Sequence, residues 1–179
     1  MTLFCIENAA LALFGIHNMD YETLDNIADA YIPVLAIIVF FASVFVDSGS
    51  QNRLKIIFFR LICLSILLGI AYGFMFLDLS YAIWPSLGLD YSTHTAVSLV
   101  LVLFLGLLIS KLRLLWFFSL VVYFCLMLYQ KYHSVADILS TALVLFITMA
   151  LVFSPILIGT SARKLRRSKT MVAMFPFFQ

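Results

Sequence analysis

Two histidines and one aspartate are the residues of this chain whose types and spacing could do chemistry. His94 follows Ser92 and Thr93, and His133 stands four residues before Asp137. Residues four apart on a helix share one face. We therefore expect the Asp137 carboxylate to accept a hydrogen bond from one ring nitrogen of His133 and so to fix the tautomer of the imidazole. The other nitrogen would then be free to attack an electrophile. His94, His133 and Asp137 are therefore the candidate catalytic residues.

The residues beside these histidines favour an anionic substrate. Ser92 and Thr93 are good N-cap residues for a helix that contains His94. The start of such a helix offers free backbone N–H groups to a phosphate oxyanion. Lys131 could add a positive charge next to His133. We take Ser92, Thr93 and Lys131 as candidate substrate-binding residues.

Composition places these residues in a membrane protein. Of the 179 residues, 64% are hydrophobic and only 11% are charged, and the mean hydropathy is +1.12. In a soluble domain about a quarter of the residues are charged. This chain has too few polar side chains to cover its surface in water. The three cysteines lie in apolar stretches without metal-ligand spacing and are expected to be buried small hydrophobes. No cofactor is expected.

Five apolar stretches approach the roughly 20 residues that a membrane-spanning helix needs. They are Tyr31–Val46, Leu54–Leu77, Thr93–Ser110, Leu114–Gln130 and Val135–Thr160. We expect an all-α, polytopic transmembrane bundle over residues 31–160, after an interfacial or amphipathic segment at 1–30 and before a basic tail at 161–179. Residues 1–16 are apolar but too short to span, and a sixth, tilted span there is the alternative. The bundle would thus have about five or six helices.

Charge placement orients the bundle. Ten of the eleven basic residues fall at one end of the spans, and the other end holds only Lys131 beside most of the acidic residues. By the positive-inside rule the basic end and the C-terminal tail are cytoplasmic, and the tail could touch anionic headgroups. Two crossings separate the His94 and His133 segments, so both lie on the extracytoplasmic side. The small size and this pattern suggest a bacterial inner membrane, with no role in binding nucleic acid.

Two side chains near the ends of spans are expected at the membrane interfaces. Arg60 lies inside the second apolar stretch but near enough to its start to snorkel outward. Trp84, in the loop Asp78–Ser92, is typical of an aromatic belt.

The histidine segments resemble two motifs of the type 2 phosphatidic acid phosphatase superfamily. Ser92-Thr-His94-Thr95 is similar to its PSGHT motif, and His133-Ser-Val-Ala-Asp137 to the HxxxD end of SRxxxxxHxxxD. The resemblance covers about residues 90–140. It implies that His133 is a nucleophile forming a phosphohistidine, that Asp137 orients it, and that His94 protonates the leaving group. The sphingomyelin-synthase-like branch of that superfamily keeps a similar His-His-Asp triad and transfers head groups.

The basic residues of the family pattern are missing. Tyr91 and Thr93 replace its Pro and Gly, and Met127 stands where the SR arginine would fall. Arg53 and Arg60 echo the KxxxxxxRP motif, but we reject this match because a span of about 30 Å separates them from His94. Lys131 is then the remaining candidate for a phosphate clamp.

The resemblance implies a lipid phosphatase or phosphotransferase acting on a lipid phosphate at the outer leaflet. The head group would sit under the loop Asp78–Ser92 and the lipid tail between helices. The alternative is a non-catalytic member of the fold, either a lipid-binding pseudoenzyme or a subunit with a membrane protein partner. Histidines at helix ends can also be simple polar caps, and a zinc site of both histidines with Asp137 and Asp90 is a further alternative, although we expect no metal.

Overall fold

The structure is a computed structural model that describes residues 20–46 and 51–163, with side chains up to residue 152. The helices are α2 (Tyr21–Phe45), α3 (Arg53–Tyr81), α4 (Thr93–Leu108), α5 (Arg113–Tyr129) and α6 (Val135–Arg163), with short 3₁₀ turns η2 (Pro85–Leu87) and η3 (Ser110–Leu112). No strand occurs in the described ranges. The expected all-α fold is confirmed. The interpretations of residues 1–19 and 164–179 lie outside the described residues.

Four helical segments are long and apolar enough to cross a membrane, which indicates an integral membrane protein. They are α2, α3, η3 with α5 (Ser110–Tyr129), and α6 as far as Val152. Many of their large apolar side chains, such as Phe40, Phe58 and Phe146, are more than half exposed. In water such a surface would be unfavourable, whereas lipid chains can cover it.

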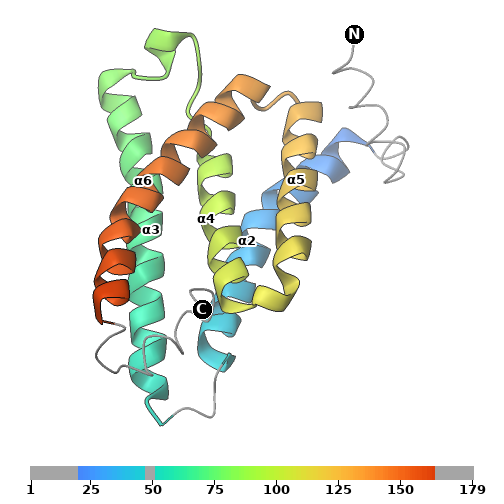
Figure 1. The fold of residues 1–179 in the computed structure, drawn as a ribbon. Coiled ribbons are helices and arrows are strands. Elements are labelled where there is room, and N and C mark those ends of the chain that lie inside the picture. The colour runs from blue at the N-terminus through green and yellow to red at the C-terminus, as the bar shows by residue number, and fades with distance from the viewer. Residues whose placement is uncertain (1–19, 47–50, 164–179) are drawn as a thin grey trace.

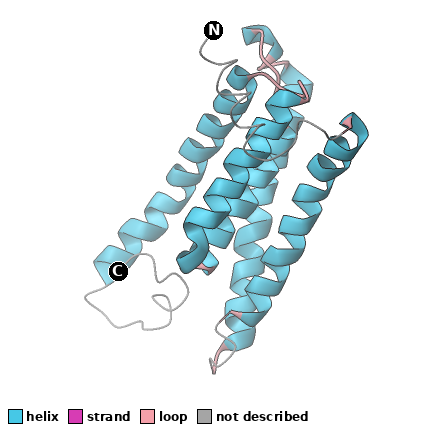
Figure 2. Cartoon of the chain, turned by 90° about the vertical axis from the view of Figure 1, so that its right-hand side faces the viewer, coloured by secondary structure: helices cyan, strands magenta, loops and turns pink. Residues whose placement is uncertain are grey.

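Helix α4 is the centre of the bundle. It has 16 residues and packs against α2, α3, α5 and α6. Figure 1 shows α4 among these helices, and Figure 2 shows the helical bundle turned by 90°. Every residue from Thr95 to Val102 is buried. A helix that is apolar all round is expected to be enclosed by other helices. Helix α4 is enclosed in this way, and its first turn carries His94.

The acidic segment before the first span belongs to α2. This helix begins ten residues before the predicted Tyr31, with Asp20 as its N-cap and Glu22 in its first turn. Negative charges at a helix N-terminus interact favourably with its dipole, so the polar residues extend the helix instead of ending it. The start of α2 thereby reaches the same end of the bundle as the starts of α4 and α6 (Figure 1).

Arg60 does not snorkel outward as expected. Its side chain is 2% exposed and donates from Nη1 to the carbonyl oxygens of Ser43 (3.3 Å) and Val46 (2.9 Å). These carbonyls lie at the C-terminus of α2, where backbone acceptors have no intrahelical partners. Arg53 adds a longer contact, 3.4 Å, to the carbonyl of Val44. The two arginines therefore bind the end of α2, at the pole of the bundle opposite His94.

Trp84 also differs from the prediction of an interfacial belt. It is 5% exposed, packs edge-on against Phe74 and Tyr91, and donates from Nε1 to Ser140 Oγ at 3.1 Å. Its backbone N–H donates to Asp78. The indole thus fills the space under the loop between α3 and α4, where the substrate head group was expected.

Candidate functional site

Ser92 joins the start of α4 to α6. It is the N-cap of α4, and its Oγ accepts from the N–H of Thr95 at 3.2 Å. Its own N–H donates to Oγ1 of Thr141 at 3.1 Å. Ser92 is fully buried, whereas Thr93 is half-buried and His94 is exposed. Ser92 therefore positions the first turn of α4, and the exposed side of that turn carries His94.

The turn between α5 and α6 presents His133. Helix α5 ends in a Schellman motif, in which the N–H of Tyr132 bonds to the carbonyl of Met127 and that of Lys131 to Leu128, both at 3.1 Å. Lys131 takes the left-handed position at φ 58°, which glycine usually occupies. The chain is thereby turned sharply so that His133 precedes α6 by two residues. His133 is thus not on a helix with Asp137, contrary to our expectation, because Ser134 caps α6 after it.

Asp137 makes hydrogen bonds to the backbone of two segments. One carboxylate oxygen, Oδ2, accepts from the N–H (2.8 Å) and Oγ (2.7 Å) of Ser134, and Ser134 Oγ accepts in return from the N–H of Asp137 at 3.2 Å. This reciprocal pair is a capping box. The other oxygen, Oδ1, accepts from the N–H of Asp90 at 2.8 Å. Asp137 therefore ties the start of α6 to the loop that leads into α4.

Asp90 is the carboxylate that faces His133. Nδ1 of His133 lies 3.5 Å from Oδ2 of Asp90, close enough for an ion pair with a protonated imidazole. At this distance it is not a hydrogen bond, and Nδ1 has no hydrogen-bond partner among the described residues. Asp137 holds the Asp90 backbone and so helps to fix the carboxylate that faces His133, in addition to the direct electrostatic effect of Asp137 on the imidazole. In the sequence, Asp90 was considered only as a possible zinc ligand. The spacing Ser134-x-x-Asp137 is that of a capping box and could have predicted that the Asp137 carboxylate bonds to the start of α6.

His94 lies at the same end of the bundle. Its ring stacks with that of Tyr132, with 6.4 Å between centroids and 9° between planes. The hydroxyl of Tyr132 donates to the carboxylate of Asp25 in the first turns of α2. Three helix ends and one turn thus converge here, and we call His94, His133, Asp90, Asp137 and Tyr132 the histidine cluster.

Lys131 and Met127, the other two positions discussed for phosphate binding, differ in exposure. Lys131 is exposed on the turn next to His133. Met127, at the position of the family's arginine, is 1% exposed and packs with Leu24, Ala28 and Tyr123. Within the described part of the chain, no group of three or more His, Cys, Asp or Glu residues could hold a metal ion.

Burial and charge act in opposite directions on the pKa of His133. Burial is the largest influence and lowers the pKa, while Asp90 and then Asp137 raise it and His94 lowers it, leaving the pKa below the ordinary 6.5. A lowered pKa keeps the imidazole neutral near pH 7. The folded state then disfavours the protonated form, so any contribution of His133 to acid sensitivity is a loss of stability as the pH falls through 6.5.

We expect Asp90→Asn to lower the pKa of His133 further, because the substitution removes the largest attraction for a proton. His94→Ala should raise the pKa, because it removes a repelling charge. NMR titration of imidazole-labelled protein in micelles measures both shifts against the wild type. A His133 pKa that is unchanged in Asp90→Asn would contradict the pairing of the two side chains.

The chain matches no protein-family model, and comparison with curated proteins and with solved structures gives no match either.

Proposed function

We propose that this protein is a membrane lipid phosphatase or phosphotransferase that works through a phosphohistidine on His133. The observation that carries the proposal is the 3.5 Å approach of His133 Nδ1 to the carboxylate of Asp90, at the end of the bundle where α4 exposes His94. A carboxylate at Nδ1 favours the tautomer whose Nε2 lone pair is free. We place this cluster on the extracytoplasmic side of a bacterial inner membrane.

The reaction would run in two steps. Nε2 of His133 attacks phosphorus, the bond from phosphorus to the leaving oxygen breaks, and protonated His94 gives its proton to that oxygen. Asp90 stabilises the positive charge that develops on the His133 ring. In the second step, water or the hydroxyl of an acceptor lipid attacks phosphorus, the phosphorus–nitrogen bond breaks, and His94 takes the proton from the attacking oxygen.

The anionic transition state would be held at the start of α4. The first turn of a helix has backbone N–H groups without intrahelical partners, and its dipole favours negative charge. Thr93 is the first residue of α4, and the exposed Lys131 precedes Tyr132, whose ring stacks with that of His94. Because Trp84 fills the space under the neighbouring loop, we place the head group at the α4 start and the α5–α6 turn instead.

His133→Ala is expected to lower turnover by about 10³-fold or more, since it removes the attacking atom. The measurement is phosphate release and head-group transfer by purified protein in mixed micelles, across diacylglycerol phosphate and isoprenyl phosphates. Ser86→Ala, an exposed change on the same side of the bundle, is the control and should keep wild-type turnover. Full activity in His133→Ala would contradict the proposed mechanism.

One observation favours a second candidate, a non-catalytic lipid-binding or accessory protein. Met127 is buried in an apolar cluster where the resembling family has a phosphate-binding arginine. If the protein is non-catalytic, we expect no turnover with any lipid phosphate. We also expect His94→Ala and His133→Ala to leave the cellular phenotype unchanged. The same micelle assay, run together with the phenotype of these two variants, separates the two functions.

A further inference from the structure

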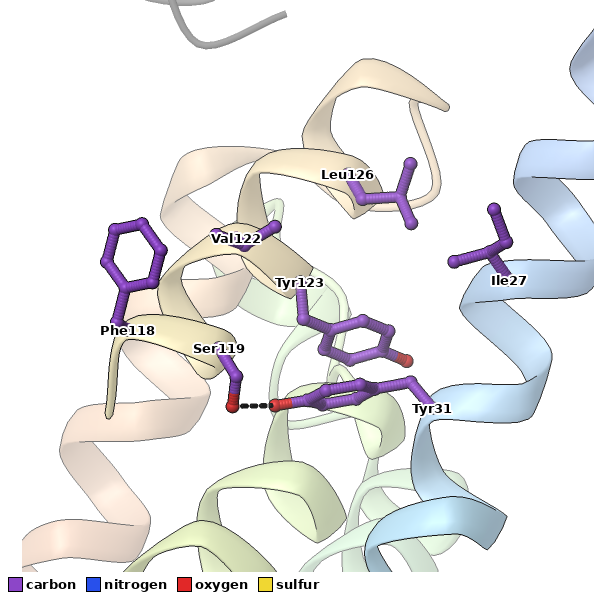
Figure 3. A pocket seen from close by; sticks show the side chains of 7 residues that line it. All are labelled: Ile27, Tyr31, Phe118, Ser119, Val122, Tyr123 and Leu126. Atoms are coloured by element: carbon purple, nitrogen blue, oxygen red, sulfur yellow. Dashed lines mark hydrogen bonds between the residues drawn. The ribbon is translucent and has the colours of Figure 1, made fainter. Parts of the chain in front are cut away.

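A groove of about 300 Å³ runs between α2 and α5. It is lined on α2 by Ile27 and Tyr31, and on α5 by Phe118, Ser119, Val122, Tyr123 and Leu126 (Figure 3). The lining is almost entirely apolar, and none of these residues belongs to the histidine cluster. Exposed Phe117 and Phe118 lie on the same helix. The groove therefore belongs to the part of the surface that meets lipid chains.

Two tyrosines form the polar part of this groove. Their rings stack with 4.1 Å between centroids, and the hydroxyl of Tyr31 shares a hydrogen bond of 3.0 Å with Ser119 Oγ (Figure 3). Tyr123 is 3% exposed, and its hydroxyl has no hydrogen-bond partner among the described residues. A buried hydroxyl that lacks a hydrogen-bond partner is costly.

The depth of Tyr123 indicates which acceptor could meet it. Tyr123 lies six residues before the end of α5 at Tyr129, or about 9 Å along the helix axis. On α2, Tyr31 comes two residues after the exposed Asp29. A charged side chain such as Asp29 is expected at the level of the headgroups. Tyr31, and Tyr123 stacked on it, therefore lie within about one helical turn of the membrane interface, where tyrosine is common. Ester carbonyls of glycerolipids lie at this interface and accept hydrogen bonds.

We propose that the groove binds one acyl chain of an ester lipid, with the ester carbonyl accepting a hydrogen bond from Tyr123. The chain would pass Val122 and descend toward Phe118, and the apolar lining fits it. Because lipid tails are as apolar as the protein surface, burial alone gives little preference in a membrane. The hydroxyl supplies the selectivity. This proposal stands apart from phosphoryl transfer and holds for a catalytic or a non-catalytic protein.

The test uses the full chain in nanodiscs of equal parts diester and diether phosphatidylglycerol with identical chain lengths. Native mass spectrometry counts the lipids that the protein retains. We expect the wild type to favour the diester by about twofold to tenfold, the value of one net hydrogen bond. Tyr123→Phe should retain lipid without this preference, and Val122→Trp should fill the groove and lose the lipid. Val121→Trp, an exposed change on the neighbouring face of α5, is the matched control.

Three results would overturn the proposal: no diester preference in the wild type, equal loss in Val121→Trp, or full retention in Val122→Trp. A photo-crosslinking phenylalanine at position 122 identifies the occupant directly. A lipid adduct supports the proposal, whereas an adduct with residues 1–19 or with a second copy overturns it. Repeating the measurement in His133→Ala, which should bind the lipid normally, separates failure of this site from failure of the proposed reaction.

Discussion

Asp137→Ala is expected to lower the free energy of unfolding by about 3 kcal/mol and to abolish turnover. The substitution removes the carboxylate half of the capping box, the bond from the N–H of Ser134, and two further charge-assisted hydrogen bonds from the Asp90 N–H and the Ser134 hydroxyl, at about 1 kcal/mol each. It also frees the backbone of Asp90, so the carboxylate facing His133 loses its fixed position. Detergent titration followed by circular dichroism measures the stability, and the micelle assay measures turnover.

Ser134→Ala is the matched control for this prediction. It removes the hydroxyl from the capping box but leaves the carboxylate bound to the N–H groups of Ser134 and Asp90. We expect a loss of about 1 kcal/mol in the free energy of unfolding and turnover near that of the wild type. An Asp137→Ala protein that is as stable as Ser134→Ala would show that the bond to Asp90 contributes nothing.

The helices could be predicted from sequence because their signals are local. Polar residues at Lys111–Arg113 and at Tyr129–Ser134 break the apolar runs, and these breaks predict where α4, α5 and α6 lie to within a few residues. Helix α4 was expected to be a span, but with 16 residues it is shorter than the roughly 20 that a span needs. The common location of His94 and His133 followed from counting crossings. The structure places both at one end of the bundle, as the crossing count required.

The partners of the site residues could not be predicted, because each depends on a tertiary contact. Lys131 carries no glycine-like signal for the left-handed turn that it makes, and this turn separates His133 from the helix of Asp137. Asp90 faces His133 from a loop whose backbone is hydrogen-bonded to Asp137. Trp84 turns inward because Ser140 accepts from its indole N–H. The spacing of His133 and Asp137 predicted a contact between them, whereas the carboxylate that lies 3.5 Å from Nδ1 of His133 is that of Asp90.

Arg60→Ala is expected to lower the free energy of unfolding by about 3–5 kcal/mol. The guanidinium donates hydrogen bonds to the carbonyl oxygens of Ser43 and Val46. Its removal leaves these buried acceptors unpaired, which costs about 1–3 kcal/mol for each of them. The truncation also opens a cavity beside the core. Arg53→Ala is the control, since that side chain is half-buried and makes only a 3.4 Å contact; we expect a loss below about 1 kcal/mol. An Arg60→Ala protein as stable as Arg53→Ala would contradict this role.

The same residue tests at which end of the bundle the proposed lipid phosphate substrate would bind. Arg60 lies 21 residues before the end of α3 at Tyr81, or about 30 Å along the helix, so it cannot reach a phosphate at His94. Arg60→Lys keeps the charge and should fold well enough for assay. We expect its turnover per folded molecule and its KM to equal those of the wild type. A KM raised tenfold in this variant would mean that Arg60 binds substrate, and the site would then have to lie at the opposite end of the bundle from His94 and His133.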